Sequence, residues 1–235
     1  MDDIPGSGDC EARWPDGVQP VLFGTSWAYV IVGVAIAIWV GRRNDVARGW
    51  GWLFAAGLVL TGLGSADYHG PTLAPQPLAH DGGLALALLV AWGIDLARLS
   101  IATRRIALLL LAVAAAGTLV LVVNPDSSPL LAGVVAVGLV LAEVLIYRRG
   151  LRRWGWTQWV TIGSLAVGVV AFALSRTGGP WCDPDSLVQG HGVWHLLTAI
   201  ALAFWAIGAL AGSSAPTGRT VPVPTPDQTR SKGLR

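Results

Sequence analysis

Seven long apolar segments, separated by short connections, constrain this 235-residue chain more than any other feature. They lie at about 21–41, 50–69, 80–97, 105–123, 129–147, 156–175 and 190–212. A helix needs roughly 17 to 25 mostly apolar residues to cross a bilayer. Only 13% of the residues are charged, whereas a soluble domain carries about 25%. The sequence therefore predicts an all-α membrane protein, a bundle of seven transmembrane helices.

The positive charges predict the orientation of this bundle. Nearly all Lys and Arg residues follow the first, third, fifth or seventh segment, namely Arg42, Arg43, Arg48, Arg98, Arg104, Arg105, Arg148, Arg149, Arg152, Arg153, Arg219, Arg230, Lys232 and Arg235. Only Arg13 and Arg176 fall on the other side. Because cationic loops stay in the cytoplasm, we expect a multi-pass cell-membrane protein with its N-terminus outside and its C-terminus in the cytoplasm.

The chain divides into three parts by composition. Residues 1–20 form an acidic tail on the extracytoplasmic side, and they lack the positively charged region that opens a signal peptide, so we expect the tail to be retained. Residues 21–212 form the seven-helix domain. Residues 213–235 are rich in Pro, Thr, Ser and Gly, which predicts a disordered cytoplasmic tail.

The two cysteines, Cys10 and Cys182, both fall on the outer side of the predicted topology. That side is oxidising, and a disulfide persists there. We predict a Cys10–Cys182 bridge, with two free thiols as the alternative.

All four histidines fall at the same predicted membrane face. His69 ends the second segment, His80 begins the third, and His191 and His195 begin the seventh. Residues four apart share a helix face, so His191 and His195 can bind one metal ion. With His69 they make three protein ligands, the set that leaves a catalytic zinc ion one open position. We expect a zinc site at this face with His80 at its rim, against the alternative that each histidine is an interfacial residue.

Two polar residues near these histidines are candidates for catalysis. Asp81 lies beside His80, and a carboxylate there can take a proton from water that zinc has made acidic. Ser65 precedes His69 by four residues and can donate a hydrogen bond to a developing oxyanion. The alternatives are an N-cap role for Asp81 and a helix-packing role for Ser65.

Several residues inside the segments have no assigned role in that site. Glu143 lies in the fifth segment, and we expect it to pair with Arg148 or Arg149 near the cytoplasmic surface. Asp95, near the end of the third segment, stays unassigned. Trp194 lies between the two histidines of the seventh segment and is expected to face away from them.

The motif S-x-x-x-H, an early Asp in segment three and H-x-x-x-H in segment seven together resemble the alkaline ceramidase family, within the CREST superfamily of seven-span metal-dependent hydrolases. The matching residues are Ser65, His69, Asp81, His191 and His195. The stretches WCDPDSLVQGHGVWHLLTA (181–199) and DCE (9–11) look like bacterial members. The resemblance implies zinc on the three histidines, proton transfer by Asp81, assistance from Ser65, a bridge between the tail and the last outer loop, and hydrolysis of a lipid amide, typically ceramide.

Members of that family also bind calcium near the N-terminus. Asp9 and Glu11 match the acidic start of that site, but QPVLFGTSWAY (19–29) lacks the Glu and Asn that should follow. Calcium is therefore doubtful here, and a solvated acidic tail explains these residues as well.

The leading functional hypothesis is a zinc-dependent membrane hydrolase that acts on a lipid amide. The alternatives are a receptor or sensor, since the same superfamily contains the progestin and adipoQ receptors, and a transporter of metal ions or protons. The expected partner is a membrane lipid, either ceramide or another acyl amide or ester, and no nucleic acid. The oligomeric state and the identity of the lipid are left open by the sequence.

Overall fold

The computed structural model describes residues 8–12, 17–43, 48–71, 77–124 and 127–211. In these residues it contains seven helices, α1 (Pro20–Gly41), α2 (Arg48–His69), α3 (Pro77–Arg98), α4 (Thr103–Val123), α5 (Ser128–Arg148), α6 (Trp156–Leu174) and α7 (Gly190–Ala211). All seven are long and apolar enough to cross a membrane. The only extended pairing among the described residues is an isolated bridge between Asp9 and Arg176. The predicted tail at 213–235 lies outside the described residues.

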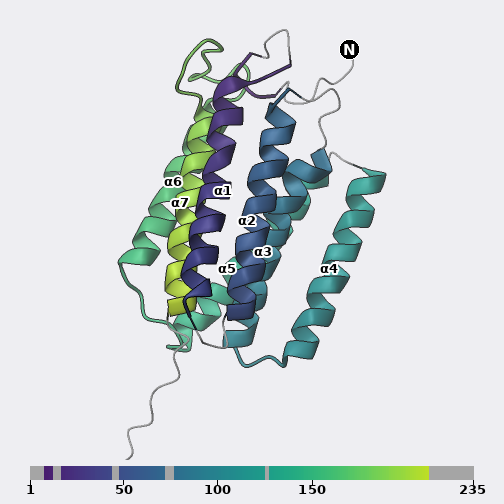
Figure 1. The fold of residues 1–235 in the computed structure, drawn as a ribbon, viewed down its shortest axis with the longest axis vertical. Coiled ribbons are helices and arrows are strands. Elements are labelled where there is room, and N and C mark those ends of the chain that lie inside the picture. Colours follow the sequence, from purple (N-terminus) through teal and green to yellow (C-terminus); the bar gives the residue numbers. More distant parts are fainter. Residues whose placement is uncertain (1–7, 13–16, 44–47, 72–76, 125–126, 212–235) are drawn as a thin grey trace, which may run out of the picture.

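The helices lie side by side as an elongated bundle, with α4 at one edge, where it packs mainly on α3 (Figure 1). The closest packing is between α1 and α2, α2 and α3, and α6 and α7. The end of α2 and the starts of α3 and α7 meet at the upper end in Figure 1, which we call the histidine end. The C-terminal ends of α1, α3 and α5 lie at the opposite end, which we call the arginine end.

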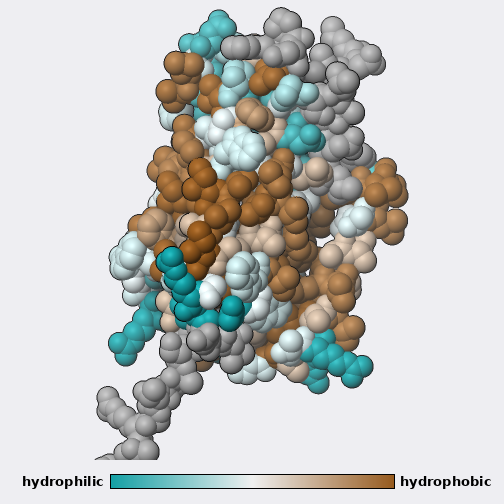
Figure 2. All heavy atoms as spheres, viewed as in Figure 1, coloured by the Kyte–Doolittle hydropathy of each residue, from teal (hydrophilic) through white to brown (hydrophobic). Residues whose placement is uncertain are grey.

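A buried apolar core joins α1, α2, α3 and α7, and it includes Tyr29, Phe54, Leu58, Ala91 and Leu202. Outside this core, α4, α5 and α6 expose large apolar side chains, among them Leu111, Val122 and Leu130. Figure 2 shows apolar residues around the middle of the bundle and hydrophilic ones toward its ends. Seven such helices with an apolar outer surface are compatible with a multi-pass membrane protein.

Glycines bring α2 and α3 together close to the histidines. A Cβ atom on Gly64 would lie 2.0 Å from the carbonyl oxygen of Ala79, and one on Gly83 would lie 2.4 Å from the backbone nitrogen of Thr61. Any larger residue would therefore push the two helices apart at the level of His80. The close approach leaves the ring centroids of His69 and His80 5.4 Å apart.

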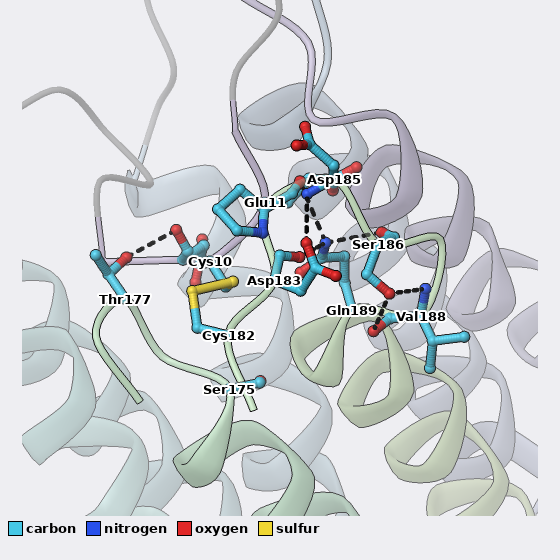
Figure 3. The surroundings of a disulfide bond; sticks show 12 residues. Cys10, Glu11, Ser175, Thr177, Cys182, Asp183, Asp185, Ser186, Val188 and Gln189 are labelled. Atoms are coloured by element: carbon cyan, nitrogen blue, oxygen red, sulfur yellow. Dashed lines mark hydrogen bonds between the residues drawn. A yellow bond between two sulfur atoms is a disulfide. The ribbon is translucent and has the colours of Figure 1, made fainter. Parts of the chain in front are cut away.

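Cys10 and Cys182 form a disulfide that joins the N-terminal tail to the loop between α6 and α7 (Figure 3), which confirms the predicted bridge. Asp9, Cys10 and Glu11 are all buried. The alternative that Asp9 and Glu11 belong to a solvated segment is wrong, because the disulfide holds these residues against the helix ends. Thr177 supports the same contact by donating its hydroxyl to the carbonyl oxygen of Asp9, at 2.9 Å.

A second polar cluster lies toward the arginine end. One guanidinium nitrogen of Arg152 lies 2.8 Å from Asp95 Oδ1, and the other lies 2.5 Å from Glu143 Oε1. The prediction that Glu143 pairs with Arg148 or Arg149 is wrong. Arg148 is five positions away and points to another face of α5, whereas Arg152 returns from the following loop into the bundle. This pairing also gives Asp95 a partner.

Candidate metal centre

Four imidazoles gather at the histidine end. His69, His80, His191 and His195 each offer one ring nitrogen, and these nitrogens all lie within 4.8 Å of one another, close enough to hold a metal ion. His69 and His195 are almost fully buried. The side chain of His80 is 22% exposed, so it lies at the rim as expected, but it also belongs to the group. The structure thus brings together the three predicted ligands and adds a fourth imidazole.

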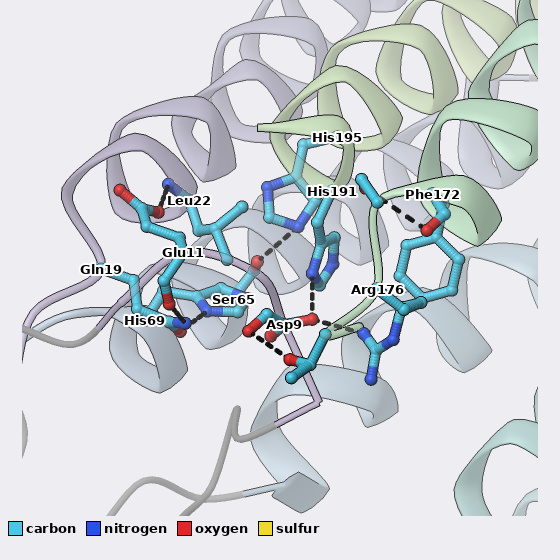
Figure 4. Close-up of polar contacts among 12 residues, drawn as sticks. Asp9, Glu11, Gln19, Leu22, Ser65, His69, Phe172, Arg176, His191 and His195 are labelled. Atoms are coloured by element: carbon cyan, nitrogen blue, oxygen red, sulfur yellow. Dashed lines mark hydrogen bonds and ion pairs between the residues drawn. The ribbon is translucent and has the colours of Figure 1, made fainter. Parts of the chain in front are cut away.

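His69 is oriented by the chain that precedes α1. Gln19 donates its side-chain NH₂ to the carbonyl oxygen of Glu11, at 2.8 Å. The amide oxygen of Gln19 therefore faces His69, where it lies 2.8 Å from Nδ1 (Figure 4). Because an amide oxygen only accepts, His69 carries its proton on Nδ1 and its lone pair on Nε2.

His191 is oriented by the buried tail. Its Nδ1 lies 2.8 Å from Oδ1 of Asp9, which also pairs with the guanidinium of Arg176. Burial alone would raise the pKa of Asp9, but the hydrogen bond from His191 and the charge of Arg176 hold that pKa below its ordinary value. An ionised carboxylate only accepts, so the His191 proton is on Nδ1.

His195 is oriented by α1. Its Nδ1 lies 3.1 Å from the hydroxyl oxygen of Thr25. The single proton of that hydroxyl is donated to the backbone, at 2.8 Å from the carbonyl oxygen of Val21. Thr25 therefore accepts from His195, which leaves the lone pair of His195 on Nε2.

Three separate contacts thus prepare the same nitrogen in His69, His191 and His195. A hydrogen bond from the second ring nitrogen to a carbonyl, carboxylate or similar acceptor is the usual support of a metal-binding histidine, because it fixes the tautomer and the ring orientation. Four nitrogens around a tetrahedral zinc ion lie about 3.4 Å apart, for bonds of about 2.1 Å. The ring nitrogens of this site lie within 4.8 Å of one another, so a zinc ion would draw them closer together. Imidazole also binds copper, iron and nickel, so the donor set defines a metal site and leaves the ion open.

Asp81 contacts the cluster through its neighbour. Its Oδ1 lies 2.6 Å from Nδ1 of His80, and its side chain is 32% exposed. The N-cap alternative is wrong, because α3 begins four residues earlier, at Pro77. Asp81 therefore orients His80 in the same way that Asp9 orients His191.

Ser65 lies inside the site, as predicted. Its hydroxyl oxygen is 2.8 Å from that of Ser26 and 3.5 Å from Nε2 of His195. Ser26 donates its own proton to the carbonyl oxygen of Leu22, at 2.7 Å. The Ser65 proton is therefore directed to Ser26 or toward His195. A buried hydroxyl with these partners is more than a small packing residue.

The two candidate calcium ligands have other partners. Asp9 supports His191, and the two carboxylate oxygens of Glu11 accept from the backbone nitrogens of Val21 and Leu22, at 2.8 and 2.9 Å. Glu11 thus caps the N-terminus of α1, where a negative charge is favourable. These contacts account for both carboxylates without calcium.

Four polar residues at the start of α1 and within it were not predicted to belong to the site. Gln19, Thr25 and Ser26 support the site directly, and Tyr29 bonds the hydroxyl of Thr198 while its ring lies 5.8 Å from that of His195. Ser26 and Tyr29 are three apart, and Thr25 and Tyr29 are four apart, so they share one face of the helix. That polar stripe in an otherwise apolar segment was the signal that could have revealed them.

An apolar cavity of about 330 Å³ lies between α3, α5, α6 and α7. Its upper part is lined by Trp194 and Thr198 on α7, within one turn of His195. Thr198 and Thr161 are its polar lining residues, and both donate their hydroxyls to backbone carbonyl oxygens, at 2.6 and 2.9 Å. Trp194 packs on Phe172 of α6, with ring centroids 5.9 Å apart.

No known protein-family model matches this sequence, and no curated protein matches it.

Proposed function

We propose that this protein is a zinc-dependent membrane hydrolase that cleaves an amide bond in a ceramide-like lipid. The observation that carries the proposal is the convergence of three imidazoles, each with its lone pair on Nε2, in a bundle whose apolar cavity begins within one helical turn of His195. The resemblance of the surrounding motifs to the alkaline ceramidases supplies the choice of zinc and of the amide.

His69, His191 and His195 would hold the metal. When bound, zinc polarises a carbonyl group and makes hydroxide available near neutral pH. The protein's own contribution is preorganisation, since Gln19, Asp9 and Thr25 each fix one of the three rings. Mutations of Gln19, Asp9 or Thr25 should therefore weaken zinc binding directly and slow substrate turnover only as a consequence.

Ser65 and the His80–Asp81 pair have different catalytic roles, oxyanion stabilisation for Ser65 and proton transfer for the pair. Ser65 turns its hydroxyl from Ser26 toward the substrate carbonyl, whose oxygen gains charge in the transition state. Asp81 and His80, the most exposed members of the site, would accept the proton of the attacking water and pass it to the amine as the C–N bond breaks.

The cavity is suited to bind the alkyl chain of a lipid substrate. It has the size and the apolar lining of small-molecule sites. Gly133 and Val140 line it and are also exposed on the outside of the bundle. An acyl chain can therefore enter sideways from the bilayer while its amide group stays at the histidine end.

The distribution of polar groups favours an enzyme over a transporter. The histidine site and the cluster of Asp95, Glu143 and Arg152 lie toward opposite ends of the bundle. Phe54, Leu58 and Leu202 belong to the apolar core of the described helices between them. A continuous path of polar side chains, which an ion or proton relay needs, would have to cross that core.

The test is to measure zinc content and fatty-acid release on the same purified protein, with ceramide, another acyl amide and an acyl ester as substrates. We expect stoichiometric zinc and release from the amide, and loss of both in His195→Ala. His80→Ala should retain zinc, because it keeps the three proposed ligands whose rings Gln19, Asp9 and Thr25 orient. Bound zinc without turnover of any substrate would favour the sensor alternative, and unchanged zinc in His195→Ala would refute the site.

A further inference from the structure

The deep end of the apolar cavity is formed by Trp205. The lining on α7 begins at Trp194 and ends at Trp205, which is 8% exposed. The Trp205 ring packs against Phe54, with ring centroids 5.2 Å apart. A large aromatic ring thus lines the cavity at the end farthest from the histidines.

The orientation of this ring is fixed by charged residues behind it. The indole nitrogen of Trp205 donates to Oε1 of Glu143, at 2.5 Å. Glu143 follows the lining residues Leu139 and Val140 by four and three positions, so it lies on the same face of α5, just beyond the cavity. Arg152 holds Glu143 in turn and joins it to Asp95.

An alkyl chain cannot advance past this point without a large cost. It would have to displace the indole from Glu143 and then meet a buried ion pair, whose members would lose partners that they need. The charged cluster therefore acts as the support of Trp205, and Trp205 acts as the apolar floor.

The distance to that floor corresponds to a chain of defined length. Trp194 and Trp205 are eleven residues apart on one helix, which is about 16 Å along its axis. Fully extended bonds advance about 1.2 Å each, so this depth holds about 13 carbon–carbon bonds. We propose that Trp205 is a specificity-determining residue, and that it limits the substrate's acyl chain to roughly that length.

This inference rests on the proposed function for the identity of the substrate, but it is tested by binding alone. Saturated fatty acids from octanoic to stearic acid are ranked by their displacement of radiolabelled myristic acid from the full-length protein in lipid nanodiscs. We expect affinity to rise along the series and to stop rising near myristic acid. A series that rises evenly to stearic acid, or an absence of binding, would overturn the inference.

Smaller residues at position 205 should move this limit toward longer acids. Trp205→Ala should move it at least one step toward longer acids, with about tenfold tighter binding for the two added methylenes. Trp205→Phe keeps a ring but loses the hydrogen bond to Glu143, so it should move the limit less. Equal shifts in these two variants would assign the effect to the hydrogen bond and contradict the role of the ring.

Ala136 provides the reverse test without removing any hydrogen-bonding side chain. It is half-buried and lines the cavity on α5, midway between Ala132 and Val140. Ala136→Leu should shift the limit toward shorter acids, whereas Ala115→Leu, an exposed position on α4 outside this lining, should leave it unchanged. If Ala136→Leu leaves the ranking unchanged, the inference fails while amide hydrolysis can still be observed. If the ranking shifts in a protein that neither binds zinc nor cleaves amides, the inference stands and the proposed function fails.

Discussion

Gln19 and His69 are fifty positions apart in the sequence, yet the amide oxygen of one lies 2.8 Å from Nδ1 of the other. The backbone repeats the contact, because the Gln19 nitrogen donates to the His69 carbonyl oxygen at 2.9 Å. Glu11 fixes the Gln19 amide, and it also caps α1. The tail, the start of α1 and the end of α2 therefore form one support for a single imidazole.

Gln19→Ala should weaken zinc binding about tenfold to a hundredfold, which is the usual effect of removing a residue that supports a metal ligand. The imidazole of His69 would keep its place in α2 but lose the contact that fixes its tautomer. Competition with a zinc chelator on the purified protein measures the change. Gln158→Ala, which removes an amide from the other end of the bundle, is the matched control and should bind zinc normally. Equal affinity in both variants would show that Gln19 does not support the metal.

Substitutions of Asp9 should weaken zinc binding to different degrees, because the contact with His191 needs an acceptor oxygen and the contact with Arg176 needs a negative charge. Asp9→Asn keeps an oxygen that can accept from His191 but loses the charge that faces Arg176, so zinc affinity should fall moderately. Asp9→Ala loses both contacts and should bind zinc at least tenfold more weakly than the Asn variant does. Chelator competition gives the order, with Asp185→Ala, an exposed acidic residue in the α6–α7 loop, as the control. Identical losses in the Asn and Ala variants would contradict a hydrogen-bonding role.

The helices and the gathering of the histidines could be predicted from the sequence, because both follow from the lengths of the apolar runs and the order of the spans. Apolar runs of about 20 residues define the spans, and the odd-numbered connections carry the arginines, so the ends of α2, α3 and α7 meet without any knowledge of packing. The same topology brings Cys10 to the side of Cys182. Pattern alone was enough at these positions.

The position of His80 and the partner of Glu143 could not be predicted in the same way, because they depend on the tertiary packing of the helices and loops. The proximity of His80 to His69 follows from the contacts of Gly64 and Gly83, which set the distance between α2 and α3. The partner of Glu143 depends on the path of the loop that carries Arg152. Neither the distance between α2 and α3 nor the path of that loop can be read from a local sequence pattern.

Ser65→Ala should lower kcat by about a hundredfold while zinc content and KM change little, because a lost oxyanion donor acts only in the transition state. Ser26→Ala supplies the comparison. It removes the acceptor that holds the Ser65 hydroxyl in the resting site, so it should preserve most of kcat. Amide hydrolysis under saturating substrate measures both variants. A Ser26 variant as inactive as the Ser65 variant would mean that the serine pair acts as a packing unit.

Reduction of the Cys10–Cys182 disulfide should speed the loss of zinc to a chelator. The disulfide holds the tail whose neighbouring residues, Asp9 and Glu11, reach His191 and the Gln19–His69 pair. The effect should be smaller than that of Asp9→Ala, because the contacts of Thr177 and Arg176 still retain the tail. Cys10→Ser should reproduce it without reductant and should no longer respond to reductant. Zinc loss that is unaffected by either treatment would separate the tail from the metal site.

Arg152→Ala should destabilise the protein strongly. Arg152 is buried between two carboxylates, and removal of one partner from a buried ion pair costs about 3 to 5 kcal/mol, because it leaves the remaining charges uncompensated. Burial alone would lower the pKa of this guanidinium, but the charges of Glu143 and Asp95 raise it, so the group stays cationic. Thermal unfolding in detergent measures the loss, and Arg153→Ala, an exposed neighbour, should show little change. Combining Arg152→Ala with Asp95→Asn and Glu143→Gln should recover part of the stability, since the two negative charges are then removed. If the triple variant is no more stable than Arg152→Ala, the cluster stabilises the bundle through packing instead of charge.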